Sequence, residues 1–356
     1  MEGKSNGVST NVQPAGPSKA LGLIAGLIIL ALLAYSTNYL GKHVHKALEY
    51  PIWAVALGLT ANVLLTLTRT KDYITPAIRT ELFLKTGLVL LGAGINITEI
   101  ASVGGKGIVQ AIIMVTSVFF FTWWLGGVFK LNSRLKAVMS TAISICGVSA
   151  AIAAAGSVLA RKEELTYITA LVILTALPLM VLMPYAAGWL GLTPQVAGAW
   201  FGGNIDTTAA VVGAGAIYGE QAMKVASIVK MSQNALIGIA AFLLAVYWVV
   251  VGERKSDERP GARVIWDRFP KFVLGFVLTS ILASLGFFSK AQLSSIKALQ
   301  TWAFALAFIC IGLELSFKQF GKLGVKPTAV YLIATVFNTL LALGIGFLIF
   351  GGLFGI

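Results

Sequence analysis

The sequence predicts an all-α membrane protein with about eleven transmembrane helices, and three observations support this fold class. Hydrophobic residues occupy 57% of the 356 positions and charged residues only 12%, whereas a soluble domain has about 25% charged residues. The mean hydropathy is +0.86. Apolar runs of about twenty residues, long enough to cross the hydrocarbon core as helices, recur along the whole chain. A transmembrane barrel would instead show short segments of alternating polarity.

The predicted helices follow one another with short connections. They cover residues 20–40, 50–67, 82–98, 107–129, 135–160, 165–187, 197–218, 225–251, 270–288, 300–317 and 327–350. We expect one polytopic domain over 20–350. Residues 1–19 are polar and rich in Gly, Pro and Ser, which predicts a disordered tail. Segment 252–271 has ten charged residues and is expected to be a cytoplasmic loop.

The net charge of +13 follows the pattern of a membrane protein. In the eleven-helix arrangement, 18 of the 27 Lys and Arg residues lie on the side of the N-terminus and nine on the other side. The positive-inside rule therefore places the N-terminus in the cytoplasm and, because the helix number is odd, the C-terminus outside. The expected partner of this charge is the lipid bilayer and not nucleic acid.

Motifs of enzyme chemistry are absent from the sequence. It has no G-x-x-x-x-G-K-[ST], no G-x-S-x-G and no H-E-x-x-H. His43 and His45 fall in a predicted outer loop, where a solvated loop is the favoured interpretation over a metal site. Cys146 and Cys310 fall inside predicted helices and are expected to be small buried hydrophobes. We expect neither an enzyme nor a resident cofactor.

Polar residues interrupt the predicted helices at the segment GGNIDTTAAVVGAG. It places Asn204, Asp206, Thr207 and Thr208 in a glycine-rich stretch of an apolar run. A charge at the bilayer centre costs about 2.5–3.5 kcal/mol, so Asp206, like Glu314 in IGLELSF, is expected to face a partner or water. A functional site is the favoured interpretation for Asp206. A buried hydrogen bond or ion pair that serves only packing is the alternative for both carboxylates.

Two further interruptions lie on other predicted helices. Lys230 begins a polar stripe with Ser227, Gln233 and Asn234 on one helix face, although a lysine that snorkels from a helix end is the alternative. The segment SICGVSAA, in the middle of a long apolar run, predicts a helix break that exposes backbone groups to a cavity. Its candidate site residues are Ser144, Cys146, Gly147 and Ser149.

Two internal matches suggest repeats. A shift of 220 residues aligns LGAGINITEIASVGGK (91–106) with IGLELSFKQFGKLGVK (311–326), whose helices run in opposite directions, as in the inverted repeats of many secondary transporters. A shift of 59 residues aligns GVSAAIAAAGSVL (147–159) with DTTAAVVGAGAIY (206–218). Those two helices run in the same direction in an eleven-helix count. Either that count is wrong nearby or the second match reflects only small-residue composition.

Several segments in this order resemble one family of membrane proteins. They are SICGVSAAIAAAG, the turn RKEEL, GGNIDTTAAVVGAGAIYGEQA, VKMSQN and the C-terminal IGLELSF and GVKP. Together they resemble the sulfate exporter family, a group of conserved hypothetical membrane proteins related to the bile acid, arsenite and riboflavin transporter superfamily. The resemblance covers residues 50–350. It implies a secondary carrier of the bacterial inner membrane, with broken helices that cross near the midplane and an anion as substrate.

Two positions depart from the pattern of that family. Many members have a histidine at the position of Asp206, within I-H-[DE]-x-A-Q-V, and V-K-L-T-R where this chain has VKMSQ, which ends at Gln233. The loss of two potentially cationic groups makes the site less suited to an anion. It indicates either a different solute or a more direct use of a cation such as Na⁺ or H⁺. The oxygens of Asn204, Thr207 and Thr208 beside Asp206 would suit Na⁺. A lone carboxylate in a cavity would equally suit a proton.

These observations predict an ion-coupled secondary transporter of a small anion, sulfate-like, sulfonate-like or a small organic acid, that works by alternating access. Asp206, helped by Asn204, Thr207 and Thr208, is the expected coupling-ion site. The backbone around 146–149 and 203–208, with Lys230, is the expected substrate site. A passive anion channel and a membrane sensor or partner subunit without transport are the alternatives. A homo-oligomer is as compatible with the sequence as a monomer.

Overall fold

The computed structural model describes residues 17–43, 50–250, 266–267, 269–314 and 324–352, and all regular structure within these ranges is helical. Seven described segments are long and apolar enough to cross a membrane. They are α1 (Pro17–His43), α2 (Tyr50–Leu67), α5 (Ile97–Val128), α8 (Lys162–Trp189), the continuous pair α11 (Glu220–Ala235) and α12 (Ile237–Val250), α15 (Lys290–Glu314) and α17 (Val325–Phe350). The chain is therefore a multi-pass membrane protein, as its composition predicts.

Two predicted polar segments lie largely outside the described residues. Of the tail predicted over 1–19, only the last three residues are described, and they belong to α1. Of the charged segment 252–271, the described residues are 266–267 and 269–271. The prediction that these segments are a disordered tail and a loop therefore remains a prediction.

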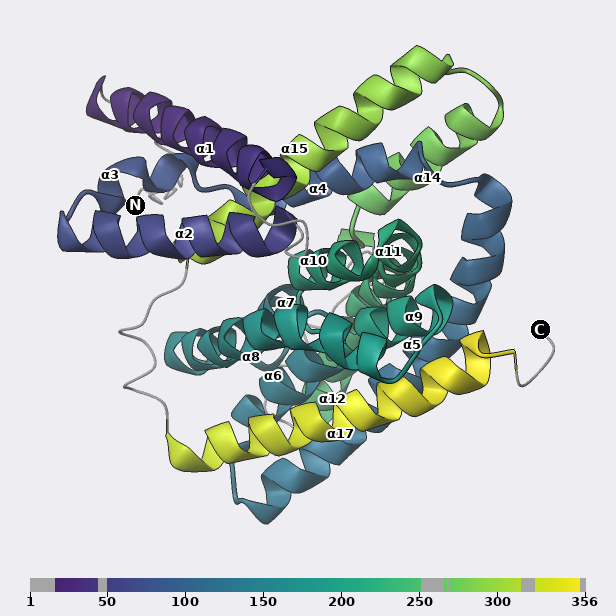
Figure 1. The fold of residues 1–356 in the computed structure, drawn as a ribbon. Helices are drawn as coiled ribbons and strands as arrows, with labels where there is room; N and C mark the ends of the chain where they lie inside the picture. The colour runs from purple at the N-terminus through teal and green to yellow at the C-terminus, as the bar shows by residue number, and fades with distance from the viewer. Residues whose placement is uncertain (1–16, 44–49, 251–265, 268, 315–323, 353–356) are drawn as a thin grey trace, which may run out of the picture.

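The helices form two groups, one above the other in Figure 1. The first, called the scaffold bundle, contains α1, α2, α3 (Lys71–Ile74), η1 (Thr75–Ala77), α4 (Thr80–Gly92), α14 (Phe272–Ser284) and α15. Its helices cross closely at glycines, because a Cβ at Gly58 would lie 2.3 Å from the Ile309 carbonyl oxygen and one at Gly92 would lie 2.2 Å from the Phe276 carbonyl oxygen. The second group, called the hairpin bundle, contains α5 to α12 and α17.

Helices α5 and α17 run antiparallel. We use α17 as the reference for the position of the other elements of the hairpin bundle across the membrane. The rings of Phe121 and Phe337 stack with centroids 3.9 Å apart. Nearer the opposite ends, Lys106 Nζ lies 5.9 Å from the centroid of the Phe350 ring. We call the membrane face where α17 begins the start face, and the face where it ends the end face. The middle of α17, around Asn338, then marks the middle of the membrane.

Helices α6 (Ser133–Ser144) and α7 (Val148–Val158) form a hairpin that enters and leaves at the start face. Helix α6 follows the end of α5, which lies at the start face. Helix α7 leads into α8, where the Tyr167 hydroxyl donates to the Gly324 carbonyl at the beginning of α17 (2.7 Å). The tip between them lies at mid-membrane, because Asn338 Nδ2 donates to the Ile143 carbonyl at 3.5 Å. This hairpin is re-entrant and does not cross the membrane.

Helices α9 (Pro194–Asn204) and α10 (Thr208–Tyr218) form a second re-entrant hairpin, from the end face. The Tyr218 hydroxyl at the end of α10 hydrogen-bonds the Leu192 carbonyl just before α9, so the two outer ends lie together. Along α9, Trp200 Nε1 donates to the Thr339 carbonyl at 2.9 Å. The Asn204 carbonyl at the tip accepts from Asn338 Nδ2 at 3.0 Å. The second tip is therefore also at mid-membrane.

The two hairpins correct the predicted eleven spans. The runs 135–160 and 197–218 are hairpins, and the runs 82–98 and 270–288 contain the short helices α4 and α14, of 13 residues each. An apolar run of 22 to 26 residues fits either one span or a hairpin of two 11- or 12-residue helices, so hydropathy alone cannot separate them. The predicted break at SICGVSAA is confirmed.

The two hairpins also bear on the 59-residue match, which aligns Gly147 with Asp206. Because the hairpins enter from opposite faces, α7 and α10 run in opposite directions, and each hairpin follows a long span, α5 or α8. The two matched helices, α7 and α10, therefore run in opposite directions in the structure, whereas the eleven-span prediction had them run in the same direction. The antiparallel arrangement of α5 and α17 also agrees with the 220-residue match.

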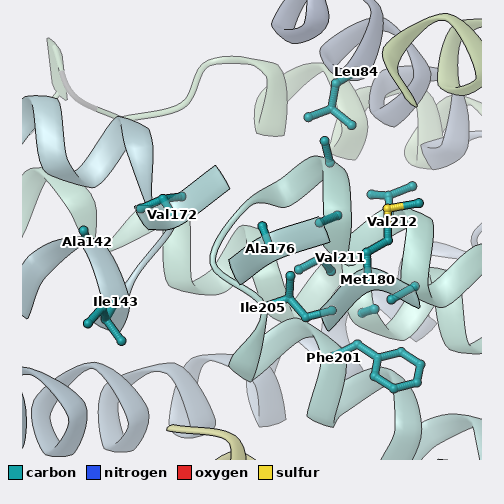
Figure 2. Packing of buried hydrophobic residues seen from close by; sticks show 14 of the residues in the cluster. Leu84, Ala142, Ile143, Val172, Ala176, Met180, Phe201, Ile205, Val211 and Val212 are labelled. Carbon is teal, nitrogen blue, oxygen red and sulfur yellow. The ribbon is translucent and has the colours of Figure 1, made fainter. Parts of the chain in front are cut away.

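Apolar side chains of α6, α8, α9 and α10 pack around the hairpin tips, as Figure 2 shows. Ile143 precedes the first tip, Ile205 forms the second, and both are buried to within 2% of full burial. Helices α8 and α10 approach closely because a Cβ at Gly213 would lie 2.4 Å from Met180 Cε. This dry packing fixes the two tips against each other in the middle of the protein.

Candidate functional site

The two hairpin tips touch at the position where the sequence places its buried carboxylate. Gly147 has a φ of +64°, a conformation that favours glycine. A Cβ at Gly147 would lie 3.3 Å from Asp206 Cβ and 2.5 Å from Val172 Cγ1. The first tip therefore needs a glycine, both for its backbone and to leave room for the second tip.

Helix α11 contacts both tips through its polar stripe. Lys230 Nζ donates to the Ile145 carbonyl of the first tip at 2.5 Å and to Gln233 Oε1 at 3.0 Å. Gln233 Nε2 in turn donates to the Gly203 carbonyl near the second tip at 3.2 Å. Lys230 is only 1% exposed, so it is not a snorkelling lysine. A buried ammonium needs such partners, because an unpaired charge in an apolar interior is costly.

Helix α17 contacts the tips from the other side with residues that the sequence analysis missed. The Tyr331 hydroxyl donates to Asp206 Oδ2 at 2.5 Å. Asn338 bonds both tips, and Thr339 Oγ1 donates to Asn204 Oδ1 at 3.1 Å. The missed signal was a set of polar residues at helical spacing within the last apolar run, at 331, 335, 338 and 339.

Asp206 and Lys230 bring opposite charges into the same buried region. Their exposed fractions are 2% and 1%, and each lies within the electrostatic field of the other. Their hydrogen-bond partners differ, since Asp206 accepts from Tyr331 while Lys230 donates to Ile145 and Gln233. Each charge therefore offsets part of the cost of burying the other.

A cavity of about 810 Å³ opens beside the tips, between the two bundles. Its hairpin wall includes Cys146, Ser149, Thr207, Thr208 and Asn234. Its scaffold wall includes five charged residues, Glu81, Lys85, Asp267, Lys271 and Glu314. Because Thr169 and Ile173, in the first half of α8, also line it, the cavity extends from mid-membrane toward the start face.

Two helices begin at this cavity and point their amino ends into it. Helix α7 begins at Val148 and α10 at Thr208, each directly after a tip. The first turn of a helix has backbone N–H groups without intrahelical acceptors, and its dipole favours negative charge. Gly147 caps α7 without a side-chain bond, whereas Thr207 Oγ1 accepts from the Ala210 N–H at 3.3 Å. Two amino ends and a buried ammonium thus meet at one mid-membrane site.

The predicted site residues divide into three sets. Cys146, Ser149, Thr207 and Thr208 line the cavity, and Glu314 lies on its opposite wall. Gly147, Asn204, Asp206 and Lys230 form the buried layer behind it. Ser144 faces its own helix, where its hydroxyl donates to the Thr141 carbonyl at 3.3 Å. Within the buried layer, Asn204 Nδ2 donates a hydrogen bond to Met183 Sδ at 3.0 Å.

A second cavity, of about 510 Å³, lies between the same bundles near the end face. It is lined by the end of α4, by Glu220 and Lys224 of α11 and by Lys297 of α15. Lys297 Nζ and Glu220 Oε2 form an ion pair at 2.8 Å across the two bundles. None of the tip residues lines this second cavity. Among the described residues, the cavity that reaches the tips extends toward the start face.

These features define a multi-pass membrane protein in which two helical hairpins meet at a buried polar site. Residues 25–331 match the family described as Conserved hypothetical protein 698, and the chain belongs to this family. It is 41% identical over 340 residues to a UPF0324 membrane protein of Rhodopirellula baltica, covering 91% of this chain and 62% of that protein. It is 37% identical over 351 residues to one of Nitratidesulfovibrio vulgaris, covering 94% and 60%.

A third relative is of similar length to this chain. A UPF0324 membrane protein of Bacillus cereus is 28% identical over 329 residues, covering 89% of this chain and 92% of that protein. The chain thus spans about three fifths of the length of the first two relatives and most of the third. No solved structure matches the chain significantly. The family agrees with the resemblance to conserved hypothetical membrane proteins, and its relatives come from bacteria.

Proposed function

We propose that the protein is a secondary transporter of a small anion, which binds where the two hairpin tips meet. The observation that supports this most is the arrangement of two helix amino ends and the buried Lys230 ammonium beside a cavity of about 810 Å³. Non-helical backbone at membrane depth is tolerated where it is buried in protein or lines a cavity, and transporters use such half-helices to bind substrates.

The chemistry of the cavity favours an anion of modest size. First-turn amides of α7 and α10 are oriented to donate hydrogen bonds to oxyanions, and the hydroxyls of Ser149, Thr207 and Thr208 add further donors. Sulfate, sulfonates and small carboxylates present suitable acceptor oxygens. The scaffold wall adds Lys85 and Lys271, with Glu81 and Glu314 as counter-charges, so the entrance carries charges of both signs.

The two cavities favour alternating access over a passive pore. Both lie between the same two bundles, one toward each face, and only the larger one is lined by tip residues. A displacement of the hairpin bundle against the scaffold bundle would close one and extend the other to the tips. A channel needs one continuous path, whereas the two cavities here are lined by separate residues.

The charge distribution orients the molecule in our proposal. With the hairpins in this arrangement, the turn with Arg161 and Lys162 moves to the start face, and 12 of the 18 Lys and Arg residues in the described part of the chain lie on that side or next to it. The positive-inside rule then makes the start face cytoplasmic and leaves the C-terminus outside, in the inner membrane of a bacterium. The larger cavity would open to the cytoplasm.

The proposed function is tested in two stages with purified protein. A thermal-shift screen against sulfate, sulfite, sulfonates and small carboxylates identifies ligands, because a ligand that binds the folded state at a hundredfold excess over its Kd stabilises it by about 2.7 kcal/mol. Counterflow of a stabilising anion in proteoliposomes then separates a transporter, which exchanges it, from a channel, which does not. Lys230→Gln should weaken binding at least tenfold. Binding without flux would indicate a sensor or partner subunit.

A further inference from the structure

We propose that the coupling ion is a proton carried by Asp206, and that its binding releases Lys230 to act as the counter-ion of the substrate anion. This inference rests on the proposed transport function and deepens it. Its basis is the arrangement of donors and acceptors around the tips, together with the opposite buried charges of the two residues.

The oxygens near Asp206 that would suit Na⁺ already accept hydrogen bonds. The donors come from α11, α17 and the start of α10, and the acceptors are Ile145 O, Gly203 O, Asn204 O, Asn204 Oδ1, Thr207 Oγ1 and Thr208 Oγ1. Two amide oxygens, Asn234 Oδ1 and Asn338 Oδ1, have no partner among the described residues. Hard metal cations are typically held by about six oxygens, so two amide oxygens and one carboxylate make a poor site.

The charge of Lys230 also acts against a metal cation at this place. Its ammonium is buried, bonded to the first tip and within the electrostatic field of Asp206. A Na⁺ ion beside Asp206 would add a second positive charge to the same desolvated region, where charges interact strongly. A proton neutralises the carboxylate at a single oxygen and needs no further ligands. Asp206 Oδ1 is the carboxylate oxygen that does not accept from Tyr331.

Charge balance then couples the proton to the anion. With Asp206 ionised, the carboxylate is the internal counter-ion of Lys230, and an added anion would leave a net negative charge in the buried layer. With Asp206 protonated, Lys230 lacks its counter-ion, so a monovalent anion restores neutrality. A divalent anion such as sulfate leaves one negative charge fewer than it would beside an ionised Asp206. Each ligand therefore strengthens the binding of the other by the same factor, as linkage requires. The anion and the proton would move together in the same direction.

Other titratable or charged groups face this region from each neighbouring element. Lys230 comes from α11, Tyr331 from α17, and Cys146 from the tip between α6 and α7. Across the cavity, the scaffold wall contributes Glu81, Lys85, Lys271, Asp267 and Glu314. Asp206 itself is buried between the hairpin tips, whereas the carboxyl groups of Glu81 and Glu314 lie on the scaffold wall of the cavity.

The test measures proton uptake when the anion binds, by titration calorimetry in buffers of different ionisation enthalpy. The probe is sulfate or whichever screened anion stabilises the protein most. We expect uptake of about one proton per anion over the range in which Asp206 titrates, and an affinity that rises about tenfold for each unit by which pH falls there. The affinity should not change when choline replaces Na⁺ at constant ionic strength.

Two variants locate the proton. Asp206→Asn imitates the neutral carboxyl group, so it should bind the anion with an affinity independent of pH, equal within a few-fold to that of the wild type at low pH. It should exchange anions in counterflow but lose accumulation driven by a pH gradient. Glu163→Gln removes an exposed carboxylate in the first turn of α8, outside the cavity lining, and should retain proton uptake and its pH slope.

The outcomes separate this inference from the proposed function. Anion binding that depends on Na⁺, or that takes up no proton in the wild type, would overturn the proton inference and leave the anion transporter standing. Retained proton uptake in Asp206→Asn would show that a group other than Asp206 binds the proton. If no screened anion binds at any pH or Na⁺ concentration, both proposals fail together.

Discussion

The two hairpins have the same backbone design but different chemistry. At the first tip, Gly147 supplies space and an unusual φ. The carbonyl oxygens of Ile145 and Ile143 accept hydrogen bonds from side chains of α11 and α17. At the equivalent position of the second tip, Asp206 supplies a charge and is held by Tyr331. One hairpin thus contributes backbone and room, and the other contributes the titratable group. The two hairpins are alike in backbone design and differ in the residue at the tip, Gly147 in one and Asp206 in the other.

The starts of the two outgoing helices differ in the same way. Thr207 caps α10 with its side chain, whereas α7 begins after Gly147 with no side-chain cap. The uncapped amino end of α7 keeps its amides available to a ligand, and the capped end of α10 is more rigid. This difference predicts that substitutions at the first tip act mainly on folding and those at the second mainly on coupling.

The largest effect is expected from Gly147→Ala. A side chain at a φ of +64° with a ψ of −111° costs about 1–3 kcal/mol, and the overlap with Val172 adds a similar amount. The melting temperature in detergent should fall sharply, with much lower yield of folded protein. Gly105→Ala in α5 is the control, because no atom lies within 4 Å of its Cβ. Equal stability of the two variants would refute the packing of the tips.

An intermediate effect is expected from Asn338→Ala, which releases both tips at once. The Asn204 carbonyl would lose its donor in a buried site, at a cost of about 1–3 kcal/mol. Thr339→Ala removes a bond to the second hairpin only and should cost about 0.5–1.5 kcal/mol. Thermal melting ranks the two variants. If Thr339→Ala is the more damaging, the shared role of Asn338 is wrong.

The smallest effect is expected at the end face, from Lys297→Gln. The ion pair with Glu220 joins the two bundles, but both side chains are more than half exposed, so it contributes at most about 1 kcal/mol. Its loss should favour the conformation closed toward the start face. The rate at which a small thiol reagent modifies Cys146, measured in a Cys310→Ser background, should then fall by at most about fivefold. A faster rate would mean that the pair does not hold the end face closed.

The sequence predicted the fold class and the chemically important positions better than it predicted their arrangement. The break at Gly147, the burial of Asp206 and the polar stripe of Lys230 were readable because polar groups are rare and costly inside a membrane. The hairpins were not readable, because two short antiparallel helices and one long helix have the same apolar length. The 59-residue match pointed to the hairpins, because an inverted repeat needs its two helices to run in opposite directions and the eleven-span prediction had them run in the same direction.

The contacts of α17 were hidden for a different reason. Tyr331 and Asn338 are ordinary residues near helix interfaces, and their importance follows from tertiary contacts with residues 125 to 195 positions earlier in the chain. The wall of the cavity contributed by α4 and α14 belongs to another bundle altogether. Spacing along one helix cannot indicate which distant segment it will meet.

The position of α17 in the chain has a consequence for biosynthesis. The hairpin tip at Ile143 and Ile145 is made early, but its donor Lys230 follows 85 residues after Ile145 and its donor Asn338 follows 195 residues after Ile143. Until those helices arrive, the exposed carbonyls of the tip have no protein partner, and hydrocarbon offers none. The hydrogen bonds that α11 and α17 make to the first hairpin tip can therefore be completed only after these two later helices have been synthesised.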